Sequence, residues 1–112
     1  MNSSAEPQKS GIAPDEAVEF ARELAAFDSL DVRGLMTVAL NSPDQQAVAD
    51  CFDLVAATQE KLRQEAGDIS SWSELSMGMS GDLEIAIAHG STQVRIGTDI
   101  FGARDPAQIW RP

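Results

Sequence analysis

The sequence predicts an α/β fold built on a parallel sheet, and two observations lead to this prediction. Within 112 residues, amphipathic helical stretches alternate with short apolar runs in the order helix, strand, helix, strand, helix, strand. Such alternation is typical of βα units, in which a helix connects two parallel strands. Three strands do not close a barrel, and both edges of the sheet stay open. We therefore expect the chain to be part of a larger α/β unit.

The first helix is expected over residues 14–28, after a polar loop over residues 2–13. Pro14 suits the first position of a helix, and Asp15 and Glu16 suit the positive end of the helix dipole. Apolar residues then recur at three- and four-residue spacing: Ala17, Phe20, Ala21, Leu24 and Phe27. This spacing predicts a single apolar face that packs into the core.

A buried strand is expected over residues 32–39, followed by a long second helix. The strand lies in the partly β-branched run LDVRGLMTVAL. Ser42 suits the N-cap of the helix, with Pro43 at its first position and Gln45 placed for a capping box. The helix is expected to continue to about residue 66 and to stop at Gly67. Its apolar side is formed by Val48, Cys51, Phe52, Val55 and Leu62.

The last third of the chain is expected to repeat the pattern on a smaller scale. We predict a strand over residues 72–77, a glycine-rich turn over residues 78–81 and a helix over residues 81–89. Gly90 ends that helix, and a short strand over residues 93–96 follows. Both strands are followed by small residues, which leave backbone N–H groups free to meet a ligand.

Composition and charge exclude several classes of function. Eighteen acidic and eight basic residues give a net charge of −10, which disfavours binding to nucleic acid or anionic lipid. Residues 89–112 carry three arginines and two acidic residues, so an anionic ligand is best received there. The one cysteine, Cys51, excludes an internal disulfide framework, and its place in an apolar stripe predicts a buried, inert thiol. No apolar run reaches membrane-spanning length, so we expect a cytoplasmic protein.

A candidate phosphate seat follows the last two predicted strands. Ser80 is expected to cap the helix that begins at Gly81, and its hydroxyl proton remains free to donate to a ligand oxygen. At the end of the neighbouring strand, Gly97 permits close backbone approach and Thr98 adds a second hydroxyl. Phosphate sites after the last two strands are a recurrent feature of parallel barrels. Capping alone is the alternative interpretation of Ser80.

Arg95 is the second candidate functional residue. Because side chains alternate along a strand, Val94 and Ile96 share one face and Arg95 points to the other. A guanidinium there needs an acceptor, since an unpaired buried charge costs several kcal/mol. One interpretation is an ion pair with a carboxylate such as Glu74. The other is a contact to a bound anion or to a heterocyclic nitrogen.

The sequence indicates no metal site. The only histidine, His89, is expected at the end of a helix, where the dipole explains it without chemistry. Cysteine pairs and a second histidine are absent from the sequence. Neither a P-loop nor a serine nucleophile motif has the required spacing.

The same residues carry a family resemblance. LSMGMSGDLEIAIAHGSTQVRIGTDIFGARD strongly resembles the closing segment of the pyridoxal 5′-phosphate (PLP) homeostasis proteins, which are similar in fold to the N-terminal barrel of alanine racemase. KSGIAPDEA and LDVRGLM extend the resemblance over nearly all of residues 2–105. It implies a partial (β/α)8 TIM barrel of the fold-type III PLP proteins, with about three to four parallel strands and intervening helices.

The resemblance also implies roles for individual residues. It implies that three residues hold the cofactor phosphate: Ser80, Gly97 and Thr98. Arg95 would face the pyridine nitrogen, where a cationic donor keeps that nitrogen unprotonated and weakens the ring as an electron sink. Met77 and Met79 would line the pocket near the ring. Packing of the two methionines into the core is the equal alternative.

The chain departs from the family in one respect that matters for the chemistry. Family members hold PLP covalently through a lysine near the end of an early strand, in the N-terminal half. Residues 1–112 are expected to correspond to the second half, and neither Lys9 nor Lys61 fits that position. The resemblance therefore implies non-covalent, weak binding of PLP.

We expect a PLP-binding homeostasis protein or carrier without catalytic turnover, and so not an enzyme. The alternatives are a fragment of a fold-type III PLP-dependent amino-acid racemase, and a non-binding half-barrel that pairs with another chain. Racemases of this type need a second catalytic residue and usually a further β-domain. Self-association or pairing with a complementary half-barrel is expected from the open sheet edges, whereas nucleic acid and membranes are not expected partners.

Overall fold

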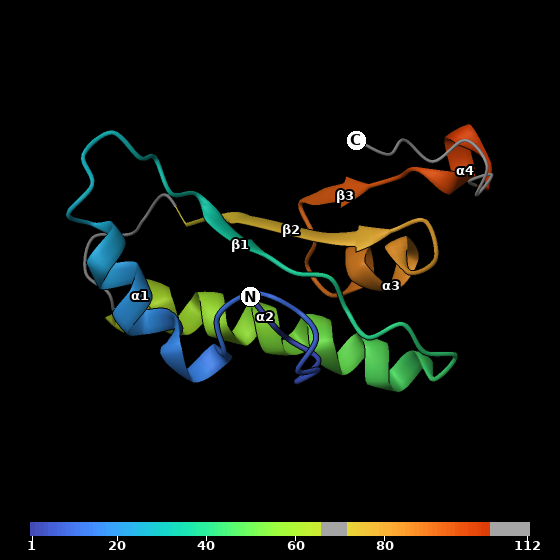
Figure 1. Cartoon of the computed structure of the whole chain (residues 1–112), viewed down its shortest axis with the longest axis horizontal. Helices are drawn as coiled ribbons and strands as arrows, with labels where there is room; N and C mark the ends of the chain where they lie inside the picture. The colour runs from blue at the N-terminus through green and yellow to red at the C-terminus, as the bar shows by residue number, and fades with distance from the viewer. Residues whose placement is uncertain (66–71, 104–112) are drawn as a thin grey trace.

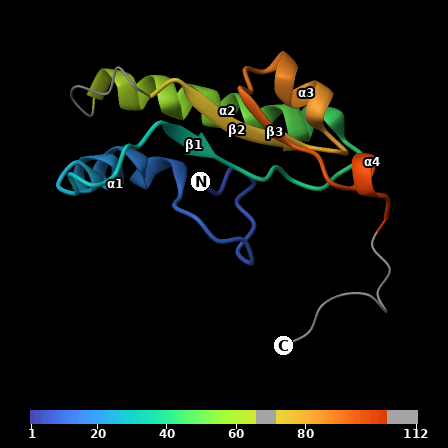
Figure 2. The ribbon, with the colours of Figure 1, turned by 90° about the horizontal axis from the view of Figure 1, so that it is seen from above.

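A computed structural model describes residues 1–65 and 72–103 of the chain. In this part, three parallel strands form a sheet in the order β1–β2–β3, with β1 at Gly34–Met36, β2 at Glu74–Met79 and β3 at Gln93–Arg95 (Figure 1). The sheet and the helices between its strands confirm the predicted α/β class and form part of a barrel. All three strands run towards the end of the molecule that carries the last helix, α4 at Thr98–Phe101 (Figure 2).

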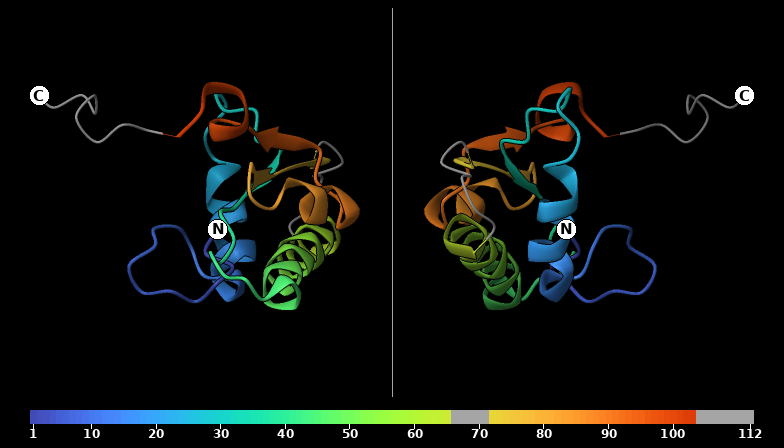
Figure 3. Two further views of the ribbon diagram at one scale, coloured as in Figure 1. Left: turned by 90° about the vertical axis from the view of Figure 1, so that its right-hand side faces the viewer. Right: turned by 90° about the vertical axis from the view of Figure 1, so that its left-hand side faces the viewer.

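The other helices lie together on one face of the sheet. They are α1 at Ala17–Leu24, α2 at Gln45–Glu65 and α3 at Leu83–Ala88. In the end-on views of Figure 3, α1 (blue), α2 (green) and α3 (orange) all lie below the strands. The opposite face, called the helix-free face below, therefore carries none of these three helices, and the short α4 follows the end of β3 (Figure 1).

The first helix is shorter than predicted. A 3-10 turn at Pro14–Glu16 precedes α1, which ends at Leu24. The N–H groups of Ala26 and Phe27 then bond to carbonyls three residues back, so the chain tightens out of the α-helix. As a result Phe27 is 58% exposed, and the prediction that it joins the core face was wrong.

Helix α2 begins at Gln45, two residues after Pro43, the predicted first position of the helix. Asp44 accepts the backbone N–H groups of Gln46 and Ala47, at 3.0 and 3.3 Å, and so performs the capping. The hydroxyl oxygen of Ser42 accepts the N–H of Asp44 instead. The predicted capping box of Ser42 and Gln45 was therefore wrong, and the predicted stop at Gly67 lies outside the described residues.

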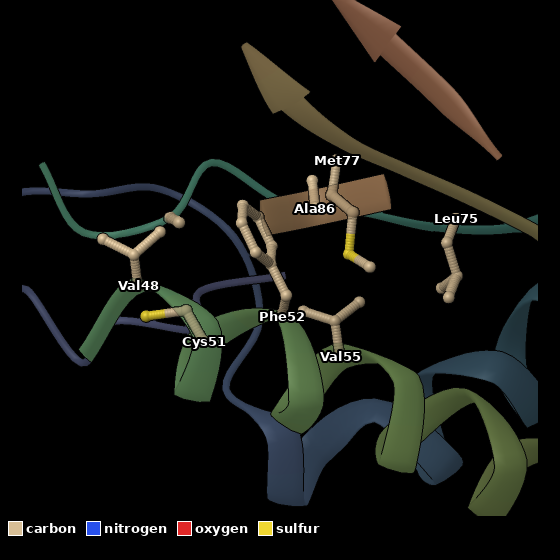
Figure 4. Close-up of a cluster of buried hydrophobic side chains, with 8 residues drawn as sticks. Val48, Cys51, Phe52, Val55, Leu75, Met77 and Ala86 are labelled. Atoms are coloured by element: carbon tan, nitrogen blue, oxygen red, sulfur yellow. The ribbon is translucent and has the colours of Figure 1, made fainter. Parts of the chain in front are cut away.

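The core lies between α2 and the sheet. Figure 4 shows Phe52 and Val55 of α2 pointing towards Met77 of β2, with Ala86 of α3 beside it. Cys51 is buried in the same cluster, as predicted. A second cluster joins α1 to the far end of α2 and to the start of β2, and it consists of Ala17, Ala21, Leu62 and Trp72. Each large buried side chain contributes about 1.5–3 kcal/mol of transfer free energy.

Strand β2 continues two residues beyond its predicted end. Gly78 was expected to open a turn, but it lies within β2, where the pairing register with β3 shifts between Ser76 and Met79. Gly78 has φ +104°, and a Cβ built on it would lie 2.7 Å from the Cβ of Ala86. Only glycine combines this backbone conformation with so close an approach of α3.

Strand β1 is shorter than the predicted run over residues 32–39. Beyond Met36, the carbonyl oxygens of Val38 and Ala39 accept the ammonium of Lys9, at 3.2 and 2.8 Å. Residues 1–3 lie beside β1: the Met1 nitrogen donates to the carbonyl oxygen of Met36 at 2.7 Å. Residues 1–3 therefore lie against this edge through terminal and side-chain contacts, and they do not form a fourth strand. Within the described residues, no helix is long and apolar enough to cross a membrane.

Candidate ligand site at the carboxyl ends of the strands

Two turns meet where β2 and β3 end. The hydroxyl oxygen of Ser80, after β2, accepts the backbone N–H groups of Gly97 and Asp99, both at 3.3 Å. The N-cap residue of α3 is Asp82, so the prediction that Ser80 caps this helix was wrong. The serine instead links the β2–α3 turn to the β3–α4 turn. The structure thus brings Ser80, Gly97 and Thr98 to one place.

This meeting point is open to ligands. Ser80 is half-buried, whereas Gly97 and Thr98 are exposed. A Cβ built on Gly97 would have no described atom within 4 Å. The Ser80 hydroxyl is an acceptor for two amides here, and its own proton remains available as a donor. The Gly97 and Asp99 amides already donate to Ser80 here, so a phosphate would take the hydroxyl protons of Ser80 and Thr98 and would replace Ser80 as the acceptor of these amides.

Arg95 lies across the helix-free face of the sheet, as the strand alternation predicted. Its Nη2 donates to the carbonyl oxygen of Thr37 at 2.6 Å and more weakly to that of Ser76 at 3.4 Å. Thr37 belongs to the segment after β1, so the side chain spans the whole width of β2. Its neighbour Val94 points the other way, towards Gly78 and α3.

The predicted ion pair of Arg95 with Glu74 does not form in the described part of the chain. The carboxylate of Glu74 accepts the Thr92 hydroxyl at 2.7 Å and the Gln93 amide at 3.5 Å. The Nε of Arg95 is buried and has no hydrogen-bond partner among the described residues. A buried guanidinium N–H without an acceptor is costly, so Arg95 would gain from turning this N–H towards an acceptor atom of a ligand.

The two methionines take different positions. Met77 is completely buried against α2, in the core arrangement that the sequence left open. Met79 is 44% exposed and pairs in register with Arg95. Met77 and Met79 would share one face of a regular strand, but the register shift between Ser76 and Met79 makes β2 irregular here. Met79, but not Met77, is therefore at the surface near the candidate site.

An apolar cavity adjoins the free face of the sheet at β1. Its volume is about 520 Å³, and it is lined by Met1, Asn2, Lys9, Ser10, Gly11, Met36, Thr37 and Val38. Thr37 connects it to Arg95, because the Thr37 carbonyl accepts the guanidinium. The cavity is large enough for a small aromatic ligand. The sequence predicted none of these lining residues as part of a site.

Lys9 forms one wall of this cavity and organises the loop before it. Besides its bonds to the segment after β1, its ammonium lies 2.9 Å from the carboxylate of Glu6. The hydrogen bond from Lys9, followed by one from Ser4, lowers the pKa of the Glu6 carboxyl from its ordinary value of 4.5. The presence of a basic residue in the N-terminal loop was the only sequence feature that could have pointed to Lys9. Its partners are the backbone carbonyls of residues 38 and 39, and the spacing of residues in the sequence does not reveal such contacts.

His89 lies away from the candidate site. It ends α3, and its Nδ1 lies 2.5 Å from the carboxylate of Asp53 on α2. The pair joins two helices on the covered side of the sheet. No group of three or more acidic, histidine or cysteine side chains that could hold a metal occurs among the described residues.

Fold and site together define a class of protein. An open parallel sheet with helices on one face and an arginine on the other is the architecture of part of an α/β barrel. The chain belongs to the family described as alanine racemase, N-terminal domain, whose model matches residues 1–105. The sequence resemblance and this match agree.

Curated relatives are longer proteins. The chain is 45% identical over 105 residues to the pyridoxal phosphate homeostasis protein of Vibrio cholerae, in an alignment that covers 94% of this chain and 43% of that protein. It is 37% identical over 107 residues to the pyridoxal phosphate homeostasis protein of Homo sapiens, where 94% of this chain covers 39% of the relative. The chain therefore spans less than half of the length of these relatives.

Solved structures show the same fold. An unknown protein from Bifidobacterium adolescentis superposes with a TM-score of 0.83 at 38% identity, over 90% of this chain and 40% of that one. PipY of Synechococcus elongatus, determined with PLP bound, gives a TM-score of 0.80 at 29% identity, over 91% of this chain and 47% of PipY.

Proposed function

We propose that this chain contributes the phosphate-binding end of a pyridoxal 5′-phosphate site and serves PLP homeostasis in the cytoplasm without catalytic turnover. The observation that carries the proposal is the convergence of Ser80 with the Gly97 and Asp99 amides, near an arginine whose Nε–H has no partner among the described residues. The names of the relatives and the PLP-bound PipY structure support the choice of ligand.

The residues present fit this ligand at both of its ends. The Ser80 hydroxyl, the Gly97 backbone and Thr98 would hold the phosphate, since all three are open to a ligand at the ends of β2 and β3. The Nε of Arg95 lacks an acceptor among the described residues, and the pyridine nitrogen is an acceptor. Met79 would contact the ring from the exposed side. Met77 is better explained as core.

The proposed role of Arg95 suits a protein that carries PLP. When bound, PLP supplies an aldehyde and a pyridine ring that withdraws electrons best when its nitrogen is protonated. A guanidinium stays charged in proteins, so Arg95 would donate a hydrogen bond to that nitrogen without transferring its proton to it. Arg95 would therefore hold the ligand and keep its ring a poor electron sink.

Binding in this chain is proposed to be non-covalent. The nitrogen of Lys9 is held by the carbonyl oxygens of Val38 and Ala39 and by the Glu6 carboxylate, so it is engaged in contacts within the protein. Lys61 lies on the exposed side of α2. Affinity then comes from the phosphate and ring contacts alone, and we expect it to be weak and reversible.

A second proposal concerns the free face of the sheet. Met36, Val38 and Met79 are between 42 and 53% exposed, and β3 is an outer strand with no further strand beside it among the described residues. We propose that this face pairs with a complementary half-barrel, as the greater length of the relatives suggests. A chain that remains strictly monomeric at high concentration, and after mixing with the N-terminal half of the Vibrio cholerae relative, would count against this.

Calorimetric titration with three ligands tests the main proposal. PLP should bind, pyridoxal should bind at least about tenfold more weakly because it lacks the phosphate, and inorganic phosphate should compete with PLP. Equal affinity for PLP and pyridoxal would reject the phosphate seat. Borohydride reduction that fixes the ligand to Lys9 or Lys61 would reject the non-covalent mode.

A further inference from the structure

The turn that carries Ser80 is closed by two hydrogen bonds between the same two residues. The N–H of Met79 donates to the Oδ1 of Asp82 at 2.7 Å, and the N–H of Asp82 donates to the carbonyl oxygen of Met79 at 3.0 Å. Ser80 and Gly81 lie between these two tied ends. The first bond involves a carboxylate and is the shorter one, so it contributes most to holding the turn.

Asp82 does not use its side chain in the usual way for its position. It is the N-cap residue of α3, yet its carboxylate makes no capping bond to that helix. Its backbone carbonyl accepts the N–H of Ala86, which begins the helix without help from the side chain. The carboxylate turns back to Met79, just past the point where the β2–β3 register shifts.

We propose that Asp82 is a positioning residue for the Ser80 hydroxyl. By accepting the Met79 N–H, the carboxylate fixes the turn in the one shape that brings the Ser80 oxygen within reach of the Gly97 and Asp99 amides. This inference rests on the proposed function only in assuming that the Ser80 hydroxyl serves to bind a phosphate.

In this proposal, Asp82 acts through its acceptor oxygen, which binds the Met79 N–H, and not through its negative charge. A carboxylate two residues from a phosphate seat opposes an anion by simple electrostatics. That cost is tolerable only if the oxygen has another task at this position. The substitution Asp82→Asn keeps an acceptor oxygen and removes the charge, so the two contributions separate cleanly.

Amide hydrogen exchange, measured by NMR on the full 112-residue chain without ligand, tests the positioning role. Rates at Met79, Gly97 and Asp99 are compared in each variant with the rate at Val55 in the core, which corrects for a general loss of stability. In Asp82→Ala, all three amides should exchange at least about tenfold faster. In Asp82→Asn, they should stay within about twofold of the parent chain. Glu84→Ala, in the first turn of α3, is the matched control and should change none of them.

The variant Ser80→Ala tests whether the Met79–Asp82 hydrogen bond depends on the Ser80 hydroxyl. Exchange should become faster at Gly97 and Asp99, which lose their acceptor, and should stay slow at Met79, whose acceptor is Asp82. The proposal is overturned if Asp82→Ala leaves Gly97 and Asp99 unchanged, or if Asp82→Asn behaves like Asp82→Ala. If Asp82→Ala does not fold, Asp82→Leu takes its place, because it also removes the acceptor oxygen and keeps a side chain of similar size; unchanged exchange at Gly97 and Asp99 in that variant overturns the proposal. If these exchange rates are found as expected but the chain binds no PLP, the proposed function is rejected, whereas the positioning role of Asp82 is supported.

Discussion

Arg95 and Thr37 are joined across the helix-free face of the sheet by a 2.6 Å hydrogen bond from the Arg95 Nη2 to the Thr37 carbonyl oxygen. The two residues are 58 positions apart in sequence and lie on opposite sides of β2. This contact fixes the guanidinium beside the apolar cavity and leaves its Nε without a partner among the described residues. It therefore connects the fold to the proposed ligand site.

Replacement of Arg95 should change ligand preference more than stability. The substitution Arg95→Met replaces a guanidinium, one of whose N–H groups has no partner among the described residues, by an apolar side chain. The free energy of unfolding should therefore change by no more than about 1–2 kcal/mol. The preference for PLP over phenyl phosphate, which has no ring nitrogen, should disappear. Calorimetric titration with both ligands measures this, and an unchanged preference would contradict the role of Arg95.

Gly34 should not tolerate a side chain. A Cβ at this position would lie 1.7 Å from the carbonyl oxygen of Glu74, its partner in register on β2. Gly34→Ala should therefore force β1 and β2 apart and cost about 1–3 kcal/mol or more in urea unfolding. Gly81→Ala is the control, because no described atom lies within 4 Å of its built Cβ, and it should change stability by less than about 0.5 kcal/mol.

Phe52 should account for a large share of the core stability. It is fully buried between α2 and the sheet, so Phe52→Ala should lower the free energy of unfolding by about 3–5 kcal/mol. Phe101 is 84% exposed, and Phe101→Ala should have little effect. Thermal unfolding followed by circular dichroism compares the two. Similar losses in both variants would show that the core is not where the structure places it.

The loop before α1 should loosen in acid. The folded-state pKa of Glu6 is lowered by the hydrogen bond from Lys9, so the contact contributes stability above the unfolded pKa, near 4.5, and loses it as the pH falls through the folded pKa. NMR titration of Glu6 should show its pKa rising towards 4.5 in Lys9→Met. If the pKa is the same in both chains, Lys9 is not the cause of the shift.

The alternation of apolar helices and strands was enough to predict the parallel sheet, because burial on one face imposes a periodicity that is visible in any sequence. The cap of α2 was placed wrongly since Ser42 and Asp44 are both good caps, and only the path of the chain into the helix selects Asp44. Gly78 was wrongly predicted to lie in a turn, because a glycine at an irregular point inside a strand has the same local composition.

The site was only partly predictable for a similar reason. Ser80, Gly97 and Thr98 follow two strands, and parallel strands end at one edge, so their proximity could be predicted. The partners of Arg95, Lys9 and Asp82 include backbone groups. Every residue has such groups, so residue identity cannot reveal which one serves as a partner.

The NMR signal of the Arg95 Nε–H tests the central claim most directly. When PLP is added, this signal and the backbone amides of Gly97 and Asp99 should shift together, because the ring nitrogen and the phosphate bind at the two ends of one ligand. Inorganic phosphate should shift the two amides and leave the arginine signal in place. If PLP causes no shift at Gly97, Asp99 and the Arg95 Nε–H, or shifts only residues elsewhere in the chain, the proposed site is wrong.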